Sequence, residues 1–203
     1  GVDQEKIIEI PAAVESSWLT EKGLAPTKKI KFLYVGRYER RKGVEEINQS
    51  ILKLSNESSG FEFHFLGPIP KAKQLRLNNI RIIYHGLIKD TLLKKNIYDS
   101  CDVLLCPSYS EGMPNVILEG MSRGLAIITS DVGAISKLVC DKNGIIIDRI
   151  SSSNIIRAIK TITKDSVKLH ELKKQSKFKV KEKFTWDNIS KLFNSKIKII
   201  HNE

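Results

Sequence analysis

Short apolar runs recur along this chain, and each has the length and the β-branched content typical of a strand buried on both faces. These runs cover residues 30–36, 61–67, 79–86, 101–108, 125–130 and 144–148. Amphipathic stretches typical of helices lie between several of them, at residues 43–55, 90–100, 114–123 and 153–163. Strands that alternate with helices of this length predict one α/β domain, built on a doubly wound parallel sheet of about six strands.

Polar, turn-forming segments follow the first four of these strands. Their sequences are VGRYERRKG, LGPIP, HGLIKD and PSYSEGMPN. The carboxyl ends of parallel strands meet at one edge of the sheet, and ligands of such folds bind in the crevice outside that edge. We therefore expect these four segments to converge on one binding site.

The segment after the first strand carries several cations but neither of the common phosphate-binding motifs. It lacks the Gly-x-Gly-x-x-Gly of dinucleotide sites and the Gly-x4-Gly-Lys-Ser/Thr of P-loops. Arg37 follows Gly36, where backbone can approach a ligand closely, and Lys42 opens the next helix, whose amides favour an anion. Arginine and lysine together suit a phosphate group. The competing interpretation is an ordinary solvated basic turn.

The stretch SEGMPNVILEG, after the fourth strand, carries two carboxylates. Pro114 suits the first position of a helix, which leaves Glu111 in the loop and places Glu119 about one to one and a half turns inside the helix. Singly, each is explained as a helix-dipole partner or a solvated residue. Together with the cations of the first loop, they provide acceptors for sugar hydroxyls beside donors for a diphosphate.

The charge of the chain narrows the class of partner. Its 34 Lys and Arg against 23 Asp and Glu give a net charge of +11, which favours an anionic partner. Nucleic acid is not expected, because its readers usually interleave aromatic and basic residues, and the lysine-rich stretch 164–183 contains only Phe178. Cys101, Cys106 and Cys140 lack the paired spacing of a zinc site and are predicted to be reduced thiols.

Two further patterns concern membranes. No apolar run approaches the roughly 20 residues that cross a bilayer, and GVDQEKIIEI lacks the blocks of a signal peptide, so we expect a cytoplasmic protein. We also hypothesise that the lysines of 164–183 hold the protein at the inner face of the membrane through anionic lipid. Ordinary solvated surface is the competing interpretation, and the lack of a broad apolar stripe favours it.

In their order along the chain, these motifs resemble the C-terminal, donor-binding domain of retaining glycosyltransferases with the GT-B fold, in the family often called glycosyl transferases group 1. The resemblance covers nearly the whole chain and rests on EKIIEIPAAVE, FLYVGRYERRKG, FHFLG, IIYHGLI, CDVLLCPSYSEGMPNVILEGMSRGLAIITSDVGAISKLV and FTW. It implies a Rossmann-like sheet that forms the C-terminal half of a GT-B fold. It also implies an enzyme of the hexosyltransferase type, active in polysaccharide biosynthesis.

The resemblance assigns roles to particular residues. It implies that Arg37 and Lys42 bind the donor diphosphate, that Glu111 meets the transferred sugar, and that Glu119 accepts hydrogen bonds from the ribose diol. Arg37, Lys42 and Glu111 are then the catalytic residues. The main chain of residues 85–88 is implied to hold the nucleobase. The full implied donor site comprises Gly36, Arg37, Lys42, His85, Gly86, Leu87, Ile88, Glu111, Gly112, Met113, Pro114, Asn115, Val116 and Glu119.

Neither a metal nor a cofactor is expected. The chain contains no Asp-x-Asp, the carboxylate pair that anchors a divalent ion in the other major glycosyltransferase fold. One departure from the family pattern stands after the fifth strand, where GAISK replaces the usual Gly-Gly-Ile-Pro-Glu and puts Ser136 and Lys137 at the Pro and Glu positions. This departure affects the expected sugar pocket and helix start.

The resemblance begins at the crossover between the two domains of such enzymes. Residues 1–15 are then the crossover segment and residues 16–203 the nucleotide-sugar donor-binding domain, so the N-terminal acceptor domain is expected outside this sequence. Alone, the chain is expected to be inactive. The acceptor implied is a saccharide or a lipid-linked saccharide. Two alternatives stay open: a non-catalytic module that binds an anionic ligand, and a sugar-nucleotide epimerase of similar fold.

Two side chains carry structural expectations. His64 lies inside an apolar strand pattern and is predicted to be a hydrogen-bonded core imidazole. Trp186, in FTW, is predicted to pack the last helix back on the domain.

Overall fold

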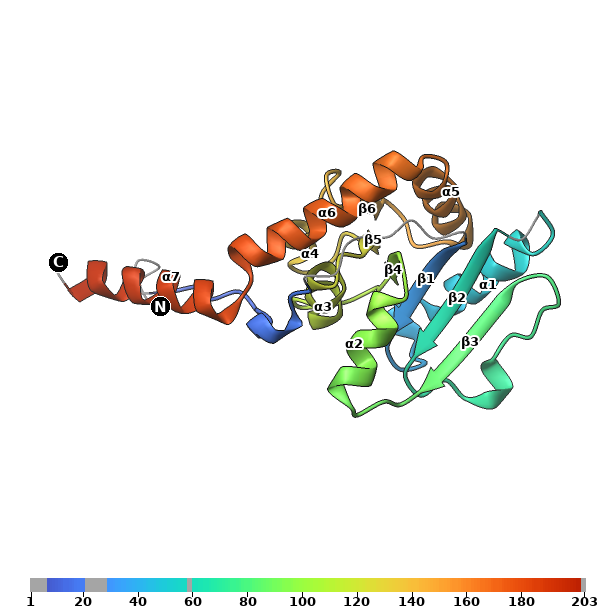
Figure 1. Cartoon of the computed structure of the whole chain (residues 1–203), viewed down its shortest axis with the longest axis horizontal. Helices are drawn as coiled ribbons and strands as arrows, with labels where there is room; N and C mark the ends of the chain where they lie inside the picture. The colour runs from blue at the N-terminus through green and yellow to red at the C-terminus, as the bar shows by residue number, and fades with distance from the viewer. Residues whose placement is uncertain (1–6, 21–28, 58–59, 202–203) are drawn as a thin grey trace.

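The computed structural model describes residues 7–20, 29–57 and 60–201 and shows one six-stranded parallel sheet (Figure 1). Its order is β3-β2-β1-β4-β5-β6. The strands are β1 (Ile30–Val35), β2 (Phe61–Leu66), β3 (Arg81–Gly86), β4 (Val103–Cys106), β5 (Ala126–Ser130) and β6 (Gly144–Ile147). Each strand lies within a run predicted from the sequence, so the doubly wound α/β fold is confirmed.

The described residues form seven α-helices, four of which match the stretches predicted at 43–55, 90–100, 114–123 and 153–163. They are α1 (Val44–Leu54), α2 (Thr91–Asp99), α3 (Asn115–Ser122), α4 (Ile135–Leu138), α5 (Ser152–Thr163), α6 (Ser166–Lys183) and α7 (Trp186–His201). Pro114 is the N-cap of α3, and its carbonyl accepts a hydrogen bond from the amide of Ile117. It was predicted to be the first residue of the helix, which is instead Asn115. The connection from β2 to β3 holds only a short 3-10 turn, Lys71–Lys73, in the place of a helix.

Alternate residues of the strands fill two apolar layers, as the two-residue period of a strand requires. Phe32 and Tyr34 of β1 face the layer formed with α1 and α5, whereas Leu33 faces the layer formed with α2, α3 and α4. Each large apolar side chain that is fully buried this way stabilises the fold by about 1.5–3 kcal/mol. Because both faces are covered, the sheet exposes its carboxyl ends to a ligand rather than either face.

The last two helices leave the sheet in different ways. Leu169 and Leu172 anchor the start of α6 in one layer and Val180 anchors its end in the other. The following helix, α7, projects away from the sheet (Figure 1). Where it begins, Val14 pairs with the backbone of Phe184 and Trp186.

The prediction for Trp186 was wrong. Its side chain is 44% exposed at the start of α7, and the neighbouring Phe184 occupies the core instead. The crossover segment predicted at 1–15 is described from residue 7 onward, so residues 1–6 of that segment lie outside the described residues.

The sheet reverses its strand order between β1 and β4, because β2 and β3 extend it on one side and β5 and β6 on the other. At such a switch point the segments that leave the two central strands turn to opposite faces and open a crevice between them. The loops after β1 and β4 carry the cations and the carboxylate singled out in the sequence. The topology therefore places the predicted residues where a ligand is expected.

Candidate functional site

The loops after β1 and β4 are held against each other by backbone contacts. The amide of Tyr109 donates to the carbonyl of Arg41 over 2.7 Å. Gly43, with φ of +66°, caps α1, and a Cβ there would lie 2.0 Å from the carbonyl oxygen of Pro107. Only glycine combines that backbone conformation with that close approach. Gly43 thus lets the cationic loop lie directly on the loop that carries Glu111.

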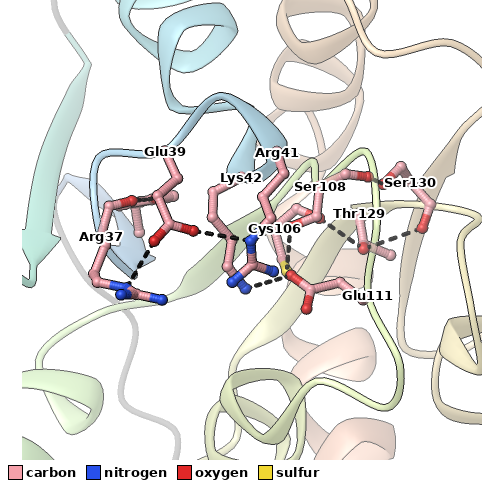
Figure 2. Close-up of polar contacts among 10 residues, drawn as sticks. Arg37, Glu39, Arg41, Lys42, Cys106, Ser108, Glu111, Thr129 and Ser130 are labelled. Carbon is pink, nitrogen blue, oxygen red and sulfur yellow. Dashed lines mark hydrogen bonds and ion pairs between the residues drawn. The ribbon is translucent and has the colours of Figure 1, made fainter.

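Lys42 and Glu111 form an ion pair across this junction (Figure 2). Their Nζ and Oε1 atoms are 2.6 Å apart, and their side chains are 18% and 8% exposed. Lys42 belongs to a 3-10 turn before Gly43 rather than to α1 itself, where the sequence had placed it. The structure therefore brings together two residues that were predicted for one site from different motifs.

Arg37 lies beside this pair but is far more exposed. Its Nε is 2.8 Å from Glu39, and the other oxygen of Glu39 is 2.8 Å from Nε of Arg41. Figure 2 shows Arg37, Lys42 and Arg41 aligned along the same side of the loop. The Arg37 side chain is 68% exposed, so its guanidinium group is accessible to a ligand. Its backbone is fixed, because the hydroxyl of Tyr34 donates to its carbonyl over 2.7 Å.

Glu111 is also supported from the loop after β5. Gly133 has φ of +60°, and a Cβ there would lie 2.1 Å from the carbonyl oxygen of Glu111. The next amide, Ala134, donates to the carbonyl of Gly112 over 2.8 Å. Lys137, which stands where the family pattern has Glu, pairs with Glu9 of the predicted crossover segment. Helix α4 forms there without the usual proline.

Buried polar groups fill the space beneath the loops (Figure 2). The hydroxyl of Thr129 donates to the carbonyl of Cys106 over 2.9 Å, and the hydroxyl of Ser130 donates to the carbonyl of Ser108. Burial raises the pKa of the Cys106 thiol to about 11, so this sulfur stays protonated at neutral pH. As predicted, it is a reduced core thiol.

Glu119 lies in a second cluster, on α3. Its Oε1 is 2.7 Å from Nζ of Lys94, and its Oε2 accepts the hydroxyl of Tyr98 at 2.6 Å. Burial, followed by the charge of Glu119, raises the pKa of Tyr98 well above its ordinary value. Nζ of Lys94 also lies 5.1 Å from the ring centre of Trp18. Glu119 is therefore a fixed carboxylate rather than a loose surface side chain.

The remaining predicted residues occupy the loop after β3 and the start of α3. Gly86 ends β3 with φ of +69°, and Leu87 after it is 69% exposed. Ile88, Met113 and Val116 all pack partly buried against the layer formed with α2, α3 and α4. The sulfur of Met113 accepts the amide of Ala12 over 3.1 Å. Asn115 is the first residue of α3.

His85 is half-buried on β3, and its ring is hydrogen-bonded to His64. His64 is 5% exposed and also bonds Glu62. The prediction of a hydrogen-bonded core imidazole at residue 64 is confirmed.

Sequence reasoning missed three side chains that hold the predicted ones. Lys94 and Tyr98 bracket Glu119, and Glu39 bridges two arginines of the basic loop. One signal was available, since Lys94 and Tyr98 stand four residues apart on a predicted helix and so share a face. Nothing in the local sequence, however, indicated that this face meets α3.

Other features of the described residues lie apart from this site. A cavity of about 600 Å³ along the edge strand β6, between α5 and α6, contains none of the predicted donor-binding residues. Within the described ranges, no three His, Cys, Asp or Glu side chains gather as a metal site would require. No described helix has both the length and the apolar content to span a membrane.

Curated proteins of similar sequence carry glycosyltransferase names. The teichuronic acid biosynthesis glycosyltransferase TuaC of Bacillus subtilis is 29% identical over 130 residues, which cover 63% of this chain and 31% of that protein. An N-acetylgalactosaminyltransferase of Campylobacter jejuni, named for a diphospho-undecaprenol acceptor, is 30% identical over 132 residues, covering 64% and 34%. The chain thus spans less than half the length of these relatives.

Solved structures of similar fold include glycosyltransferases. Sucrose-phosphate synthase of Thermosynechococcus elongatus superposes with a TM-score of 0.76 at 21% identity, over 95% of this chain and 52% of that one. The Anabaena protein HepE, solved with UDP and glucose, gives 0.69 at 17% identity, over 84% and 48%. The C-terminal domain of LpcC from Francisella tularensis gives 0.67 at 23% identity, over 92% and 100%. These likenesses show the GT-B type of Rossmann-like fold.

One family model matches the sequence itself. It is described as glycosyl transferases group 1, and it covers residues 29–165, from the start of β1 to the turn before α6. That span includes every residue predicted for the donor site. Because the match extends over more than half of the chain, this protein belongs to the glycosyl transferases group 1 family.

Proposed function

We propose that this chain is the donor-binding unit of a glycosyltransferase, which moves a sugar from a nucleoside diphosphate sugar to a saccharide or lipid-linked acceptor with retention of configuration. The observation that carries the proposal is the Lys42–Glu111 pair beside Arg37, at the switch point between β1 and β4. A lysine held 2.6 Å from a carboxylate, with an exposed arginine on the same loop, suits a ligand with a diphosphate next to a sugar ring. The UDP and glucose of the HepE structure are consistent with this ligand class.

The charged side chains of the site have different roles in the transfer. When the anomeric bond breaks, negative charge develops on the leaving diphosphate, and Arg37 and Lys42 stabilise that charge electrostatically. A bound diphosphate gives Lys42 a second anionic partner. The Glu111 carboxylate can then leave Lys42 and turn to the sugar. There it accepts hydrogen bonds from the sugar hydroxyls and stabilises positive charge at the anomeric carbon. Glu119, fixed on α3, accepts hydrogen bonds from the ribose hydroxyls.

The acceptor side belongs to the other half of the enzyme. We propose that residues 1–15 form the crossover to that half and that the acceptor-binding domain lies outside residues 16–203. The pairing of Val14 with the start of α7 supports this arrangement, because it brings the beginning and the end of the domain together at one side. The lipid-linked acceptor named for the Campylobacter relative supports the acceptor class.

Titration calorimetry of this chain with UDP, GDP and their sugars tests the proposal. We expect one base series to bind, with the affinity unchanged by EDTA, because the proposed cations of the diphosphate site are side chains. Binding that vanishes with EDTA and returns with Mg²⁺ contradicts the metal-free part. Failure of every nucleotide in the panel to bind contradicts the proposal as a whole.

A matched pair of variants localises the binding. Lys42 and Lys160 each form an ion pair with a glutamate, but the Lys160–Glu57 pair lies on α5 and the segment after α1. We expect Lys42→Ala to weaken nucleotide binding and Lys160→Ala to leave it unchanged. Equal effects of the two substitutions would mean that only the overall charge of the protein is sensed.

A further inference from the structure

Three titratable side chains are joined by hydrogen bonds across β2 and β3. Oε1 of Glu62 is 2.8 Å from Nε2 of His64, and Nδ1 of His64 is 2.9 Å from Nε2 of His85. The two imidazole rings also stack, with centroids 5.1 Å apart. Glu62 and His64 are 6% and 5% exposed, so water does not compete for these bonds. We refer to the three residues as the Glu62–His64–His85 network.

The donors and acceptors of this network run in one direction. A carboxylate can only accept, so Nε2 of His64 must carry the proton that it donates to Glu62. A neutral His64 then presents a lone pair at Nδ1, so Nε2 of His85 must donate to it. A neutral His85 is left with a lone pair at its own Nδ1. Glu62 therefore fixes the tautomer of His85 through two hydrogen bonds.

Both rings are held in the neutral form. Burial lowers the pKa of His64 below its ordinary 6.5, against the opposing effect of Glu62. Lys31 of β1 and Arg81 of β3 add to the lowering at His64. Burial also lowers the pKa of His85, and the neighbouring His64 lowers it further. At pH 7 Nδ1 of His85 is therefore a hydrogen-bond acceptor.

The network leads to the edge of the sheet where the donor site lies. His85 is the extra residue of an irregularity in the pairing of β2 with β3, and Gly86 and the exposed Leu87 follow it. Irregularities of this kind re-aim a side chain at the end of a strand. His64 shares a strand face with Leu66, which belongs to the same layer as Ile88 and Val116. Nδ1 of His85 has no hydrogen-bond partner among the described residues.

We propose that Nδ1 of His85 accepts a hydrogen bond from the nucleoside of the bound donor, and that Glu62 and His64 are positioning residues which hold His85 in the tautomer able to do so. This inference rests on the proposed function, since it names a further contact of the same donor. The partner group is a protonated ring nitrogen of the base or an O–H of the ribose. A base with a protonated ring nitrogen, such as uracil or guanine, has the first of these groups, and cytosine and adenine do not.

The tautomers are tested first, in the protein without nucleotide. Two-bond ¹H–¹⁵N spectra of the imidazole rings distinguish protonated from unprotonated nitrogens, and we expect both Nδ1 atoms of the pair to be unprotonated. His170, on the exposed side of α6, serves as the internal reference for a ring without this constraint. In Glu62→Gln the side-chain amide can both donate a hydrogen bond to Nε2 of His64 and accept one from it. The two histidine rings should then show a mixture of tautomers. A proton on Nδ1 of His85 in the wild type overturns the inference.

Two substitutions at His85 then test the contact. Asn places its oxygen close to the position of Nδ1, whereas Gln reaches the position of Nε2 and lacks the first acceptor. We expect His85→Gln to weaken UDP or GDP binding about fivefold, as loss of one hydrogen bond does, and His85→Asn to recover most of it. Two comparisons separate the sources: UDP against CDP for the base, and UDP against 2′-deoxy-UDP for the ribose. The preference that disappears in His85→Gln identifies the partner group.

The pH dependence provides a signature that a purely structural role would not produce. As the pH falls through the lowered pKa of His85, Nδ1 takes up a proton and stops accepting. The affinity of the wild type relative to that of His85→Gln should therefore be constant near neutral pH and fall in acid. Because both proteins bind the same nucleotide, comparing them at each pH cancels the effect of the phosphate titration. An equal affinity of both proteins at every pH overturns this inference but leaves the proposed function intact. Absence of nucleotide binding to the wild type overturns both.

Discussion

Two lysine–carboxylate pairs stand at opposite ends of β4, and they differ in what surrounds them. At the amino end, Nζ of Lys173 is 2.7 Å from Asp102, with side chains 9% and 4% exposed. The other oxygen of Asp102 accepts the amide of Lys31 over 3.0 Å. At the carboxyl end, Lys42 and Glu111 are 2.6 Å apart, but Lys42 lies in a single 3-10 turn and Glu111 in a loop. The two ion pairs have similar distances, but the structural elements that carry them differ.

The comparison separates a structural pair from one suited to binding. Lys173 sits on the 18-residue helix α6, so its pair fastens that helix to the start of β1 and β4. The Lys42–Glu111 pair joins two loops at the switch point, where a ligand can replace one partner with a better one. A charge pair of similar length thus serves stability at one end of a strand and, in our proposal, ligand exchange at the other.

The largest effect is expected at the structural pair. Lys173→Ala removes the Nζ that lies 2.7 Å from the buried carboxylate of Asp102, which should lower the free energy of unfolding by about 3–5 kcal/mol. Urea denaturation followed by circular dichroism measures this. Lys174→Ala, at the next and exposed position of α6, is the matched control and should change the stability by less than about 0.5 kcal/mol. If the two variants are equally stable, the distinction drawn between the ends of β4 is wrong.

The next effect is expected at Arg37, where binding and stability should separate. Arg37→Ala removes a charged donor to the diphosphate and should weaken nucleotide binding by about 1.5–3 kcal/mol. The melting temperature should stay nearly constant, because exposed ion pairs such as Arg37–Glu39 contribute about 0–1 kcal/mol. Calorimetry and thermal melts on the same sample test both parts. Nucleotide affinity equal to that of wild type would remove Arg37 from the site.

A smaller effect distinguishes the carboxylate on α3 from the cations of the loop. Glu119→Ala should weaken nucleoside and nucleotide by the same factor, equivalent to about 1–2 kcal/mol, because the ribose is common to both. Arg37→Ala should affect the nucleotide alone. Parallel titrations with uridine and UDP, or guanosine and GDP, show which pattern holds. A Glu119→Ala variant with unchanged affinity for both ligands and an unchanged melting temperature would make Glu119 a surface residue.

The smallest effect concerns α6, whose outer side we propose to contact anionic lipid. Phe178 is 59% exposed there; Lys177 immediately precedes it, and Lys174 and Lys181 stand about one turn before and one turn after it. Lys174→Gln should weaken binding to vesicles rich in phosphatidylserine by about 1 kcal/mol at low salt, and less as salt rises. Lys160→Gln on α5 is the control. Equal co-sedimentation of the wild type with anionic and neutral vesicles would contradict the proposal.

Most of the fold was predictable because its signals are local. Strands buried on both faces read as continuous apolar runs, and parallel strands bring their following loops to one edge whatever those loops contain. This is why Arg37 and Glu111 were placed in one site. The strand ends were less certain, since Asp102 and Ser108 are polar residues that are nonetheless buried.

The pairings were not predictable, because each depends on residues far apart in the sequence. Lys42 and Glu111 are 69 positions apart, Lys173 and Asp102 are 71, and the two histidines are 21. A single sequence shows which side chains are charged but not which of them meet. The prediction for Trp186 was wrong for the same reason, since the apolar pattern of α7 does not reveal that the helix projects away from the sheet.

The most direct test of the account is a titration of the ¹⁵N-labelled protein with UDP and GDP, followed through the backbone amides at both ends of β4. We predict that amides of Gly36, Lys42, Gly112 and Glu119 shift on binding, whereas those of Asp102 and Lys173 keep their positions. Shifts confined to the carboxyl ends of the strands would establish the donor site at the switch point. Shifts centred on α6 and the amino ends, with Gly36 to Lys42 unmoved, would contradict it.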